Sequence, residues 1–454
     1  MRRPSGALIL IIFLLLTGLA VAEPFEDATK AYYIGDYETA YRLIKPLAEQ
    51  GLPEAQLNLG LLYDNGQGVP QDHAEAAKWY RKAAEQGNAK GQYELGLMHC
   101  TGLGVLQDYD EAVKWYRKAA EQGYAKGQYE LGRMHYTGLG VPKDYAKAVK
   151  WYRKAAEQGY AKGQNDLGIM HYTGLGVPKN YTEAVKWYRK AAEQGFAEGQ
   201  FNLGLTYENG QGLRQDYAEA VKWHRKAAEQ GYAKGQYELG VMYYNGQGVP
   251  QNYAEAAKWY RKAAEQGNAA AQFNLGLMYE NGQGLRQDYA EAVEWYRKAA
   301  EQGYAAAQNN LGVMYFNGQG VRQDYAEAVE WYRKAAEQGF AEAQYNLGLM
   351  YYTGQGVRQG YAEAAKWYRK AAGQGYAAAQ HNLGLMYYTG QGLPKNYVLA
   401  HMWFSLAASR YPASEKENRD LAEKSRDIVG SKMPPAQNAE AQRLARKWKP
   451  KMER

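Results

Sequence analysis

A tryptophan recurs every 36 residues along most of this 454-residue chain. The ten positions are Trp79, Trp115, Trp151, Trp187, Trp223, Trp259, Trp295, Trp331, Trp367 and Trp403. One bulky ring at a fixed spacing indicates one packing environment that is built repeatedly. Periods of this length are typical of solenoids, in which each repeat buries its apolar face against its neighbours. We therefore predict ten repeats of 36 residues over residues 53–412.

Each repeat contains two segments with the periodicity of an amphipathic helix, as residues 197–232 illustrate. The first segment carries Leu203 and Tyr207, and the second carries Trp223. Between them lies an Asn-Gly-Gln-Gly stretch, residues 209–212, which is unfavourable inside a helix and predicts a turn. Each repeat is therefore predicted to be a hairpin of two helices.

The ends of the second helices carry capping signals. Asp216 is followed three residues later by Glu219, which is the pattern of a capping box, and Gly231 suits the end of the same helix. Glycines such as Gly60 and Gly96 fall inside the first helices, where glycine costs about 1 kcal/mol. We interpret these as points of close approach, where a helix backbone or the tryptophan ring fills the space of the missing side chain.

The repeated motif has a recognisable family pattern. It reads Ala-x-x-Gln-x-x-Leu-Gly-x-Met-Tyr, then Gly-x-Gly-Val, then Asp-Tyr-x-Glu-Ala-x-Lys-Trp-Tyr-Arg-Lys-Ala-Ala. This pattern resembles the Sel-one-like repeat family, a longer-turn relative of the tetratricopeptide repeat. The resemblance implies an all-α fold, namely an α/α solenoid in which stacked hairpins form a right-handed superhelix. It also implies a role in protein–protein recognition, without a particular partner.

The N-terminus has the pattern of a secretory signal peptide. Arg2 and Arg3 precede an apolar run over residues 7–16, and the segment closes on Ala20-Val21-Ala22. The alternative is an uncleaved anchor, but the run is shorter than the ~20 residues that a spanning helix needs. We expect residues 1–22 to be removed and the protein to be exported, either to the periplasm or outside the cell.

The segments that flank the repeats are expected to cap the stack. Residues 23–52 follow the same 36-residue spacing, with Leu43 in the tryptophan position, and predict a degenerate half-repeat. Residues 413–454 leave the pattern and predict two further helices, over about 414–429 and 434–448. This C-terminal cap holds eleven Lys and Arg against seven Asp and Glu, so binding to an anionic surface stays open.

The sequence offers no catalytic or metal-binding pattern. It lacks the H-E-x-x-H and G-x-S-x-G motifs, and its Gly-x-Gly turns join two helices rather than a strand and a helix. His99, His135 and His171 occupy one position in successive repeats, too far apart to share a metal ion with ligand bonds of about 2 Å. We expect no enzyme, no cofactor and no metal site.

Cys100 is the one cysteine in the chain, so it cannot form an internal disulfide. We interpret it as variation at a tolerant position that tyrosine fills elsewhere, with a free thiol or an intermolecular link as alternatives. A lone cysteine also separates the chain from the cysteine-rich branch of the resembled family, for which β-lactam binding has been proposed.

The Lys-Trp-Tyr-Arg-Lys block places cations on the second helices and could form a basic ribbon for nucleic acid. However, Glu85 and Glu121 lie four residues after Arg81 and Arg117, the spacing of ion pairs on one helix face. We therefore interpret this as a solvated outer face and expect no nucleic-acid partner.

The concave face, which first helices line in tetratricopeptide-like stacks, is the expected binding site. Its fifth position is mostly aromatic, its sixth is often asparagine, and its twelfth alternates between Tyr or Phe and an acid such as Glu208 or Glu280. Aromatic anchors beside amide hydrogen-bonding groups suit a protein surface or an extended peptide. The predicted partner-binding residues are Tyr237, Tyr244, Phe273, Asn274, Asn310, Phe316, Tyr345, Asn346, Tyr352, His381, Asn382 and Tyr388. The alternative is that these aromatics brace neighbouring repeats and that asparagine is a neutral filler.

Repeats two to four differ from the rest as a block. They share lysine at the second position and an acid at the sixth, which is Glu94, Glu130 or Asp166. Local duplication explains the block without function, but it also leaves two chemically distinct halves along one groove. These could seat two partners, or two regions of one.

The function most consistent with the sequence is an exported protein–protein interaction scaffold. It would act as an adaptor or regulator and bind an envelope or secreted partner in its concave groove. One alternative is a cell-wall or β-lactam-directed hydrolase, which would need a Ser, His or Glu cluster in a closed pocket. The other is a glycan-binding envelope protein that uses the aromatic rows as sugar platforms. The oligomeric state stays open.

Overall fold

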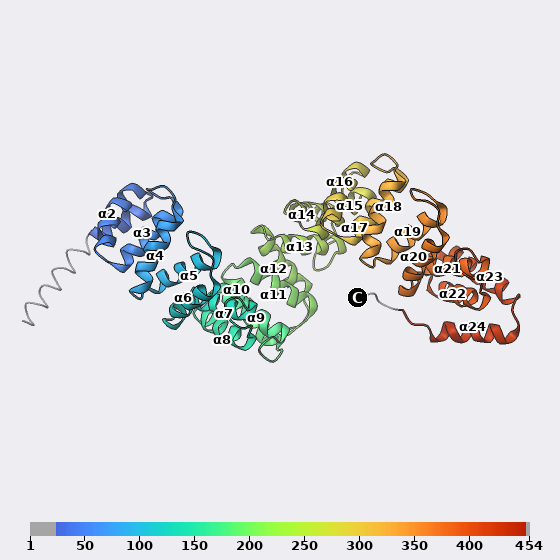
Figure 1. Ribbon diagram of the computed structural model, residues 1–454, viewed down its shortest axis with the longest axis horizontal. Coiled ribbons are helices and arrows are strands. Elements are labelled where there is room, and N and C mark those ends of the chain that lie inside the picture. The colour runs from blue at the N-terminus through green and yellow to red at the C-terminus, as the bar shows by residue number, and fades with distance from the viewer. Residues whose placement is uncertain (1–23, 451–454) are drawn as a thin grey trace, which may run out of the picture. The chain divides into compact units, whose positions relative to one another are not determined.

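The computed structural model describes residues 24–450, and all regular secondary structure in that range is helical (Figure 1). Residues 24–33 form a helix that precedes α2 (Tyr37–Glu49). The first helices of the repeats are α3 (Pro53–Asn65), α5 (Ala89–Thr101), α7 (Ala125–Thr137), α9 (Ala161–Thr173), α11 (Ala197–Asn209), α13 (Ala233–Asn245), α15 (Ala269–Asn281), α17 (Ala305–Asn317), α19 (Ala341–Thr353) and α21 (Ala377–Thr389). The second helices are α4 (His73–Glu85), α6 (Tyr109–Glu121), α8 (Tyr145–Glu157), α10 (Tyr181–Glu193), α12 (Tyr217–Glu229), α14 (Tyr253–Glu265), α16 (Tyr289–Glu301), α18 (Tyr325–Glu337), α20 (Tyr361–Gln374) and α22 (Tyr397–Arg410). The predicted all-α fold of repeated hairpins is confirmed.

The chain divides into two compact units between Ala227 and Ala228. Both are built in the same way, because helices that follow one another in the sequence pack side by side. Examples are α3 with α4 and α4 with α5 in the first unit, and α13 with α14 and α14 with α15 in the second. The core is therefore not one central cluster but a series of small clusters, each shared by neighbouring repeats.

The repeat tryptophans pack into these clusters, as Trp115 illustrates. Trp115 of α6 packs with Tyr80 and Ala83 of α4 and with Leu95 of α5, and only 4% of its surface is exposed. The ring thus bridges its own hairpin and the second helix of the preceding repeat. Three residues later on α6, the ammonium group of Lys118 lies 4.0 Å from the ring centroid. A cation in this place covers the solvent-facing side of the ring and adds a cation–π attraction.

The glycine inside each first helix is a point of close approach, as predicted, but the tryptophan is not the neighbour. A Cβ atom on Gly96 would lie 2.7 Å from the ring of Tyr116, the residue after Trp115. The same relation joins Gly60 to Tyr80. The tyrosine ring therefore lies directly on the backbone of the first helix, and any side chain at the glycine would displace it.

The second glycine of each turn joins one repeat to the previous one. Gly104 has a φ of +69°, and a Cβ there would lie 2.1 Å from the backbone oxygen of His73 at the start of α4. The turn of one repeat therefore rests on the beginning of the preceding second helix. Only glycine combines this left-handed conformation with so close an approach.

The second helices form one of the two hydrogen bonds of the predicted capping box. The side chain of the first capping residue accepts a bond as predicted, but its backbone amide has a different acceptor. The Asp72 side chain accepts a hydrogen bond of 2.9 Å from the Glu75 amide. The Asp72 amide donates instead to the Tyr63 carbonyl, also at 2.9 Å. Glu75 forms an ion pair with Lys78. The carbonyl at the end of the first helix therefore takes the place that the Glu75 carboxylate would have in a complete box.

Buried glutamines link the repeats and were not identified from the sequence. Gln92 is 4% exposed, and its Nε2 donates to the Ala84 carbonyl at 3.1 Å. Its Oε1 accepts a bond of 2.8 Å from Gln122 at the end of the next second helix. The signal was available, because glutamine stands at this position in every repeat. The full set is Gln56, Gln92, Gln128, Gln164, Gln200, Gln236, Gln272, Gln308, Gln344 and Gln380.

Helices also cover both ends of the described repeats. Ile44 of α2 is buried with Leu59 of α3 and Trp79. At the other end, the tail contains a short 3-10 turn (Ala413–Glu415), α23 (Lys416–Gly430) and α24 (Pro435–Lys447), close to the ranges expected. α23 and α24 both pack on α22. The expected signal peptide, residues 1–22, lies outside the described residues, and among residues 24–450 no helix is long and apolar enough to cross a bilayer.

Candidate partner-binding face

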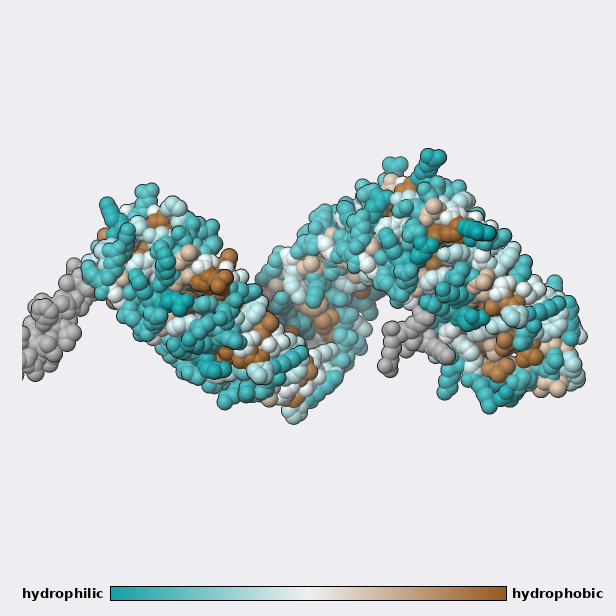
Figure 2. Space-filling model, in the orientation of Figure 1, coloured by the Kyte–Doolittle hydropathy of each residue, from teal (hydrophilic) through white to brown (hydrophobic). Residues whose placement is uncertain are grey.

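The first helices of α13 to α21 carry all the residues predicted to bind a partner. We number positions within a repeat from its first residue, at 53, 89, 125 and so on. The term first-helix face denotes positions 2, 5, 6, 9 and 12 of each first helix. In the second compact unit most of these side chains are half-buried, whereas Lys234 and Glu342 are exposed and Asn309 is buried. The surface over the repeats is mostly hydrophilic, with scattered apolar patches (Figure 2).

The aromatic residues at position 5 stack on their own repeat. The rings of Tyr237, Phe273 and Tyr345 lie 5.7–5.8 Å from the rings of Tyr260, Tyr296 and Tyr368. Phe273 and Tyr345 also contact the last residues of their own repeats, Tyr304 and Tyr376, at 5.2 and 5.3 Å. Burial raises the pKa of Tyr345. These rings therefore brace the stack, and only their outer edges remain available to a partner.

The asparagines at position 6 are hydrogen-bonded to neighbouring side chains. Asn310 donates to the Tyr296 hydroxyl at 3.4 Å, and Asn346 donates to the Asn309 oxygen at 3.0 Å. Asn382 forms a hydrogen bond to Tyr345 of the preceding repeat. Asn274 does the same with Tyr237. Each amide has two N–H donors and an acceptor oxygen, so these bonds use only part of its hydrogen-bonding capacity.

The aromatic residues at position 12 stack on the first residue of the following second helix. The ring pairs Tyr244–Tyr253, Phe316–Tyr325, Tyr352–Tyr361 and Tyr388–Tyr397 are separated by 5.1, 5.3, 5.2 and 5.7 Å. The hydroxyls of Tyr244 and Tyr352 also donate to Gln283 and Gln391, each at 2.9 Å. These glutamines belong to the turn of the next repeat, so position 12 also links repeats.

The last repeat differs because the C-terminal cap lies against it. Ser425 Oγ of α23 is 3.5 Å from His381 Nε2, and Lys432 hydrogen-bonds to Tyr388. Burial lowers the pKa of His381, which keeps this imidazole neutral near pH 7. The structure therefore places two of the predicted binding residues beside the cap.

The second helices do not carry the ion pairs expected from the sequence. Within the described residues, Arg81 does not pair with Glu85; its Nη2 lies 3.4 Å from His99 Nε2 in the next repeat. The equivalent Arg297 donates to the Tyr315 hydroxyl of the next repeat at 3.0 Å. The helical ion pairs that do form join residues three apart, such as Lys114 with Glu111 at 2.8 Å. These arginines are thus braces between repeats and not free outer-face cations.

The histidine ladder is structural in the described part of the chain. His99, His135 and His171 are all buried. Burial lowers the pKa of both His135 and His171, which favours the neutral form. Across residues 24–450, no three His, Cys, Asp or Glu side chains come together in a way that could hold a metal ion.

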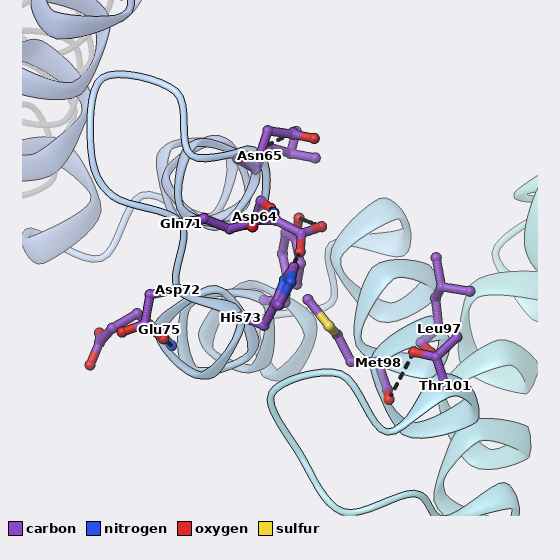
Figure 3. A network of polar contacts seen from close by, with 11 residues as sticks. Asp64, Asn65, Gln71, Asp72, His73, Glu75, Leu97, Met98 and Thr101 are labelled. Atoms are coloured by element: carbon purple, nitrogen blue, oxygen red, sulfur yellow. Dashed lines mark hydrogen bonds and ion pairs between the residues drawn. The ribbon is translucent and has the colours of Figure 1, made fainter.

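A polar cluster in the first repeat escaped the sequence analysis (Figure 3). Asp64 of α3 and His73 of α4 point toward each other, and their Oδ1 and Nδ1 atoms are 2.7 Å apart. The Tyr80 hydroxyl donates to the other Asp64 oxygen at 3.3 Å. Tyrosines fill the positions of Asp64 and His73 in several other repeats, so the pair replaces a ring stack with a hydrogen bond. Its role in the hairpin is the same.

The first-helix face also contains a cavity in repeats three and four. Its volume is about 350 Å³. The lining side chains are Arg133, Tyr136, Thr137, Tyr152, Asp166, Ile169 and Met170. Arg133 is the unusual member, because position 9 is leucine, isoleucine or valine in the other repeats.

The hairpin geometry agrees with the family comparison. The model of the Sel1 repeat matches residues 53–88, 89–124, 125–160, 161–196, 197–232, 233–268, 269–304, 305–340, 341–376 and 377–411. The chain belongs to the Sel1 repeat family. The Sel1 matches begin at Pro53, Ala89 and the equivalent residues, which are also the first residues of the first helices.

Two solved Sel1-type structures are similar over most of their length. One is a protective antigen of uropathogenic Escherichia coli with an SLR fold, 38% identical over 90% of this chain and 94% of that chain, with a TM-score of 0.57. The other is a Sel1 repeat protein from Oxalobacter formigenes, 35% identical over 68% of this chain and 89% of that chain, with a TM-score of 0.54. No curated protein sequence matches the chain. Sel1 repeat solenoids are typical scaffolds for protein–protein interaction.

Proposed function

We propose that this Sel1 repeat protein is an exported adaptor or regulator that holds an envelope or secreted protein in the concave groove lined by its first helices. The observation that carries the proposal is the unequal variation of the two helices. α16 and α18 have the same sequence, YAEAVEWYRKAAE. The first helices α15, α17 and α19 read AAAQFNLGLMYEN, AAAQNNLGVMYFN and AEAQYNLGLMYYT. They differ at positions 2, 5, 9 and 12 of the first-helix face and at position 13, the last residue of the helix.

This difference follows from what each helix does in the stack. The second helix supplies a tryptophan to the core in every repeat, with a tyrosine and the arginine brace beside it in most repeats, so its sequence is constrained. The first-helix face bears half-buried and exposed side chains that change from repeat to repeat. A row of different side chains on one rigid face suits an extended ligand, whose successive residues meet different chemistry.

Export is part of the proposal and rests on residues 1–22, whose charged start, apolar run and Ala-x-Ala end have the signal-peptide pattern. One solved relative is described as a protective antigen. An antigen that antibodies can reach is consistent with a location outside the cytoplasm. The proposal assigns no catalytic role.

The test compares changes of charge on a first helix, α19, with a change of charge on a second helix, α18. Glu342 is exposed at position 2 of α19, and Glu337 is exposed at the end of α18. Glu342→Lys together with Leu349→Asp should reduce capture of the partner from envelope extracts by at least tenfold. Glu337→Lys should leave capture unchanged. Loss of capture with Glu337→Lys alone, at equal helicity, would place the binding surface on the second helices and reject the groove.

A further inference from the structure

The cavity in repeats three and four has a definite chemical character. Tyr136 and Tyr152 supply aromatic walls, and Ile169 and Met170 supply apolar ones. The acid in the cavity is Asp166, at position 6 of α9. A volume of about 350 Å³ lies within the range of pockets that take a small ligand or one large side chain.

The two charged groups in the cavity differ in how they are neutralised. The Arg133 guanidinium is paired with Glu130, with Nε and Oε2 2.6 Å apart. Asp166 has only neutral hydrogen-bond donors, the Tyr129 hydroxyl and the Asn165 amide, each at 3.1 Å. No ion pair of Asp166 occurs among the described residues. The cavity therefore holds a carboxyl group that makes no direct ion pair, although the charge of Lys162, four residues earlier on α9, acts on it.

Other repeats show that the acid is not required by the fold. At the same position, Asn310 donates to the hydroxyl of Tyr296, which is the equivalent of Tyr152. A neutral amide thus satisfies the tyrosine there. In repeat four this position is Asp166, which forms no hydrogen bond to Tyr152 in the described structure. Burial raises the pKa of Asp166. Partial burial of an unpaired carboxylate is costly unless a cation accompanies it.

We propose that this cavity binds the side chain of a lysine or arginine from a partner polypeptide. The cationic head would pair with the Asp166 carboxylate, and the Tyr136 and Tyr152 rings would offer the π surfaces that cations favour. Ile169 and Met170 would contact the aliphatic stem. The inference rests on the proposed scaffold function, since it names the chemistry that one part of the same face recognises.

The test uses blocked tripeptides, so it does not depend on knowing the partner. Acetyl-Ala-Lys-Ala-amide and acetyl-Ala-Arg-Ala-amide are the probes, with norleucine and glutamate peptides as controls. Binding is followed through the NMR signal of the Met170 methyl group, identified by its loss in Met170→Leu. The basic peptides should shift this signal in a saturable way, and the norleucine peptide should bind at least fivefold more weakly.

Two variants separate a basic ligand from an acidic one. Asp166→Asn, which introduces the residue of Asn310, should weaken the basic peptides at least fivefold. Arg133→Leu, which restores the residue common at position 9, should preserve or strengthen their binding, because it removes a positive charge from the cavity. Asp110→Asn, an exposed change on α6 with the same change in charge, should have no effect.

Several outcomes would overturn the assignment. These are equal binding of the norleucine peptide, no saturable shift with either basic peptide, or tighter binding of the glutamate peptide that disappears in Arg133→Leu. The scaffold proposal has a separate readout. If the tripeptides do not bind while the Glu342 and Leu349 variant still loses its partner, the cavity assignment is wrong and the proposal of a partner-binding groove is retained.

Discussion

Gln92 lies buried between two repeats, and its side-chain oxygen accepts a hydrogen bond of 2.8 Å from Gln122. Its amide group donates to the Ala84 carbonyl of the preceding repeat. One side chain thus satisfies a helix-end carbonyl and fixes the next helix end. Such bonds matter mainly because a buried polar group without a partner is costly.

We expect Gln92→Leu to lower the free energy of unfolding by about 1–3 kcal/mol, because both side-chain hydrogen bonds of Gln92 would be lost and the Ala84 carbonyl would keep only backbone donors such as the Gly87 amide. Gln122→Ala should cost less, since Gln122 is exposed and only one bond is lost. Chemical denaturation followed by circular dichroism measures both. A Gln92→Leu midpoint equal to wild type would show that water replaces the lost bond.

Replacing a glycine by alanine should change the stability in opposite directions at Gly348 of α19 and Gly373 of α20. A Cβ on Gly348 would lie 2.7 Å from the Tyr368 ring, whereas a Cβ on Gly373 would meet nothing within 4 Å. Gly348→Ala should therefore destabilise the protein despite the better helix propensity of alanine. Gly373→Ala, inside α20, should stabilise it by about 0.5–1 kcal/mol. Thermal melts of the two variants test this, and a stabilising Gly348→Ala would refute the close approach.

Truncation of a tryptophan should uncouple neighbouring repeats. Trp295 packs in a cluster with Tyr260 and Ala263 of α14 and Leu275 of α15. Trp295→Ala should cost about 3–5 kcal/mol and split unfolding into more than one step. Lys298→Ala removes only the cation above the ring and should cost ~1 kcal/mol or less. A single unshifted transition in Trp295→Ala would contradict coupling through this ring.

The raised pKa of Asp166 predicts a pH dependence. Burial raises it, and Glu198 adds to the rise, while the hydrogen bonds from Asn165 and Tyr129 and the charge of Lys162 oppose it. The folded protein then binds more protons than the unfolded chain between the ordinary and raised pKa values. Stability contributed at this site therefore falls as the pH rises through that window, and it stays lower at neutral pH.

Asp166→Asn removes this titration. The variant should melt at a higher temperature than wild type at about pH 7, and the difference should shrink as the pH falls toward about 4, the ordinary aspartate pKa. Melts across this range are the measurement. A difference that is unchanged or larger at low pH would mean that the carboxyl group is not destabilised by burial.

The N-terminal pattern makes a separate prediction about processing. If residues 1–22 are a signal peptide, mass spectrometry of the exported protein should show a mature chain that begins at Glu23. Replacement of Ala20 and Ala22 by bulky residues should block cleavage and leave the longer form. Recovery of an intact Met1 in the wild-type protein would contradict this.

The repeat, its two helices and their ends could be predicted because their signals are local. The 36-residue tryptophan spacing, the turn glycines and caps such as Asp72 act within a few residues of where they occur. The half-buried first-helix face was also accessible, since apolar periodicity identifies which side of a helix faces the core. For the aromatic residues predicted on this face, the sequence left open whether they bind a partner or pack against neighbouring repeats.

Only the tertiary structure decided which side chains meet across helices. Gly96 approaches Tyr116 rather than Trp115, and Arg81 reaches His99 rather than Glu85. Each of these contacts depends on the rotation and crossing angle of neighbouring helices, which the residue spacing along one helix does not specify. The cavity at Asp166 has the same origin, because its walls come from α7, α8 and α9. Local spacing thus determined the hairpin, and the packing of one hairpin on the next determined its contacts and its cavity.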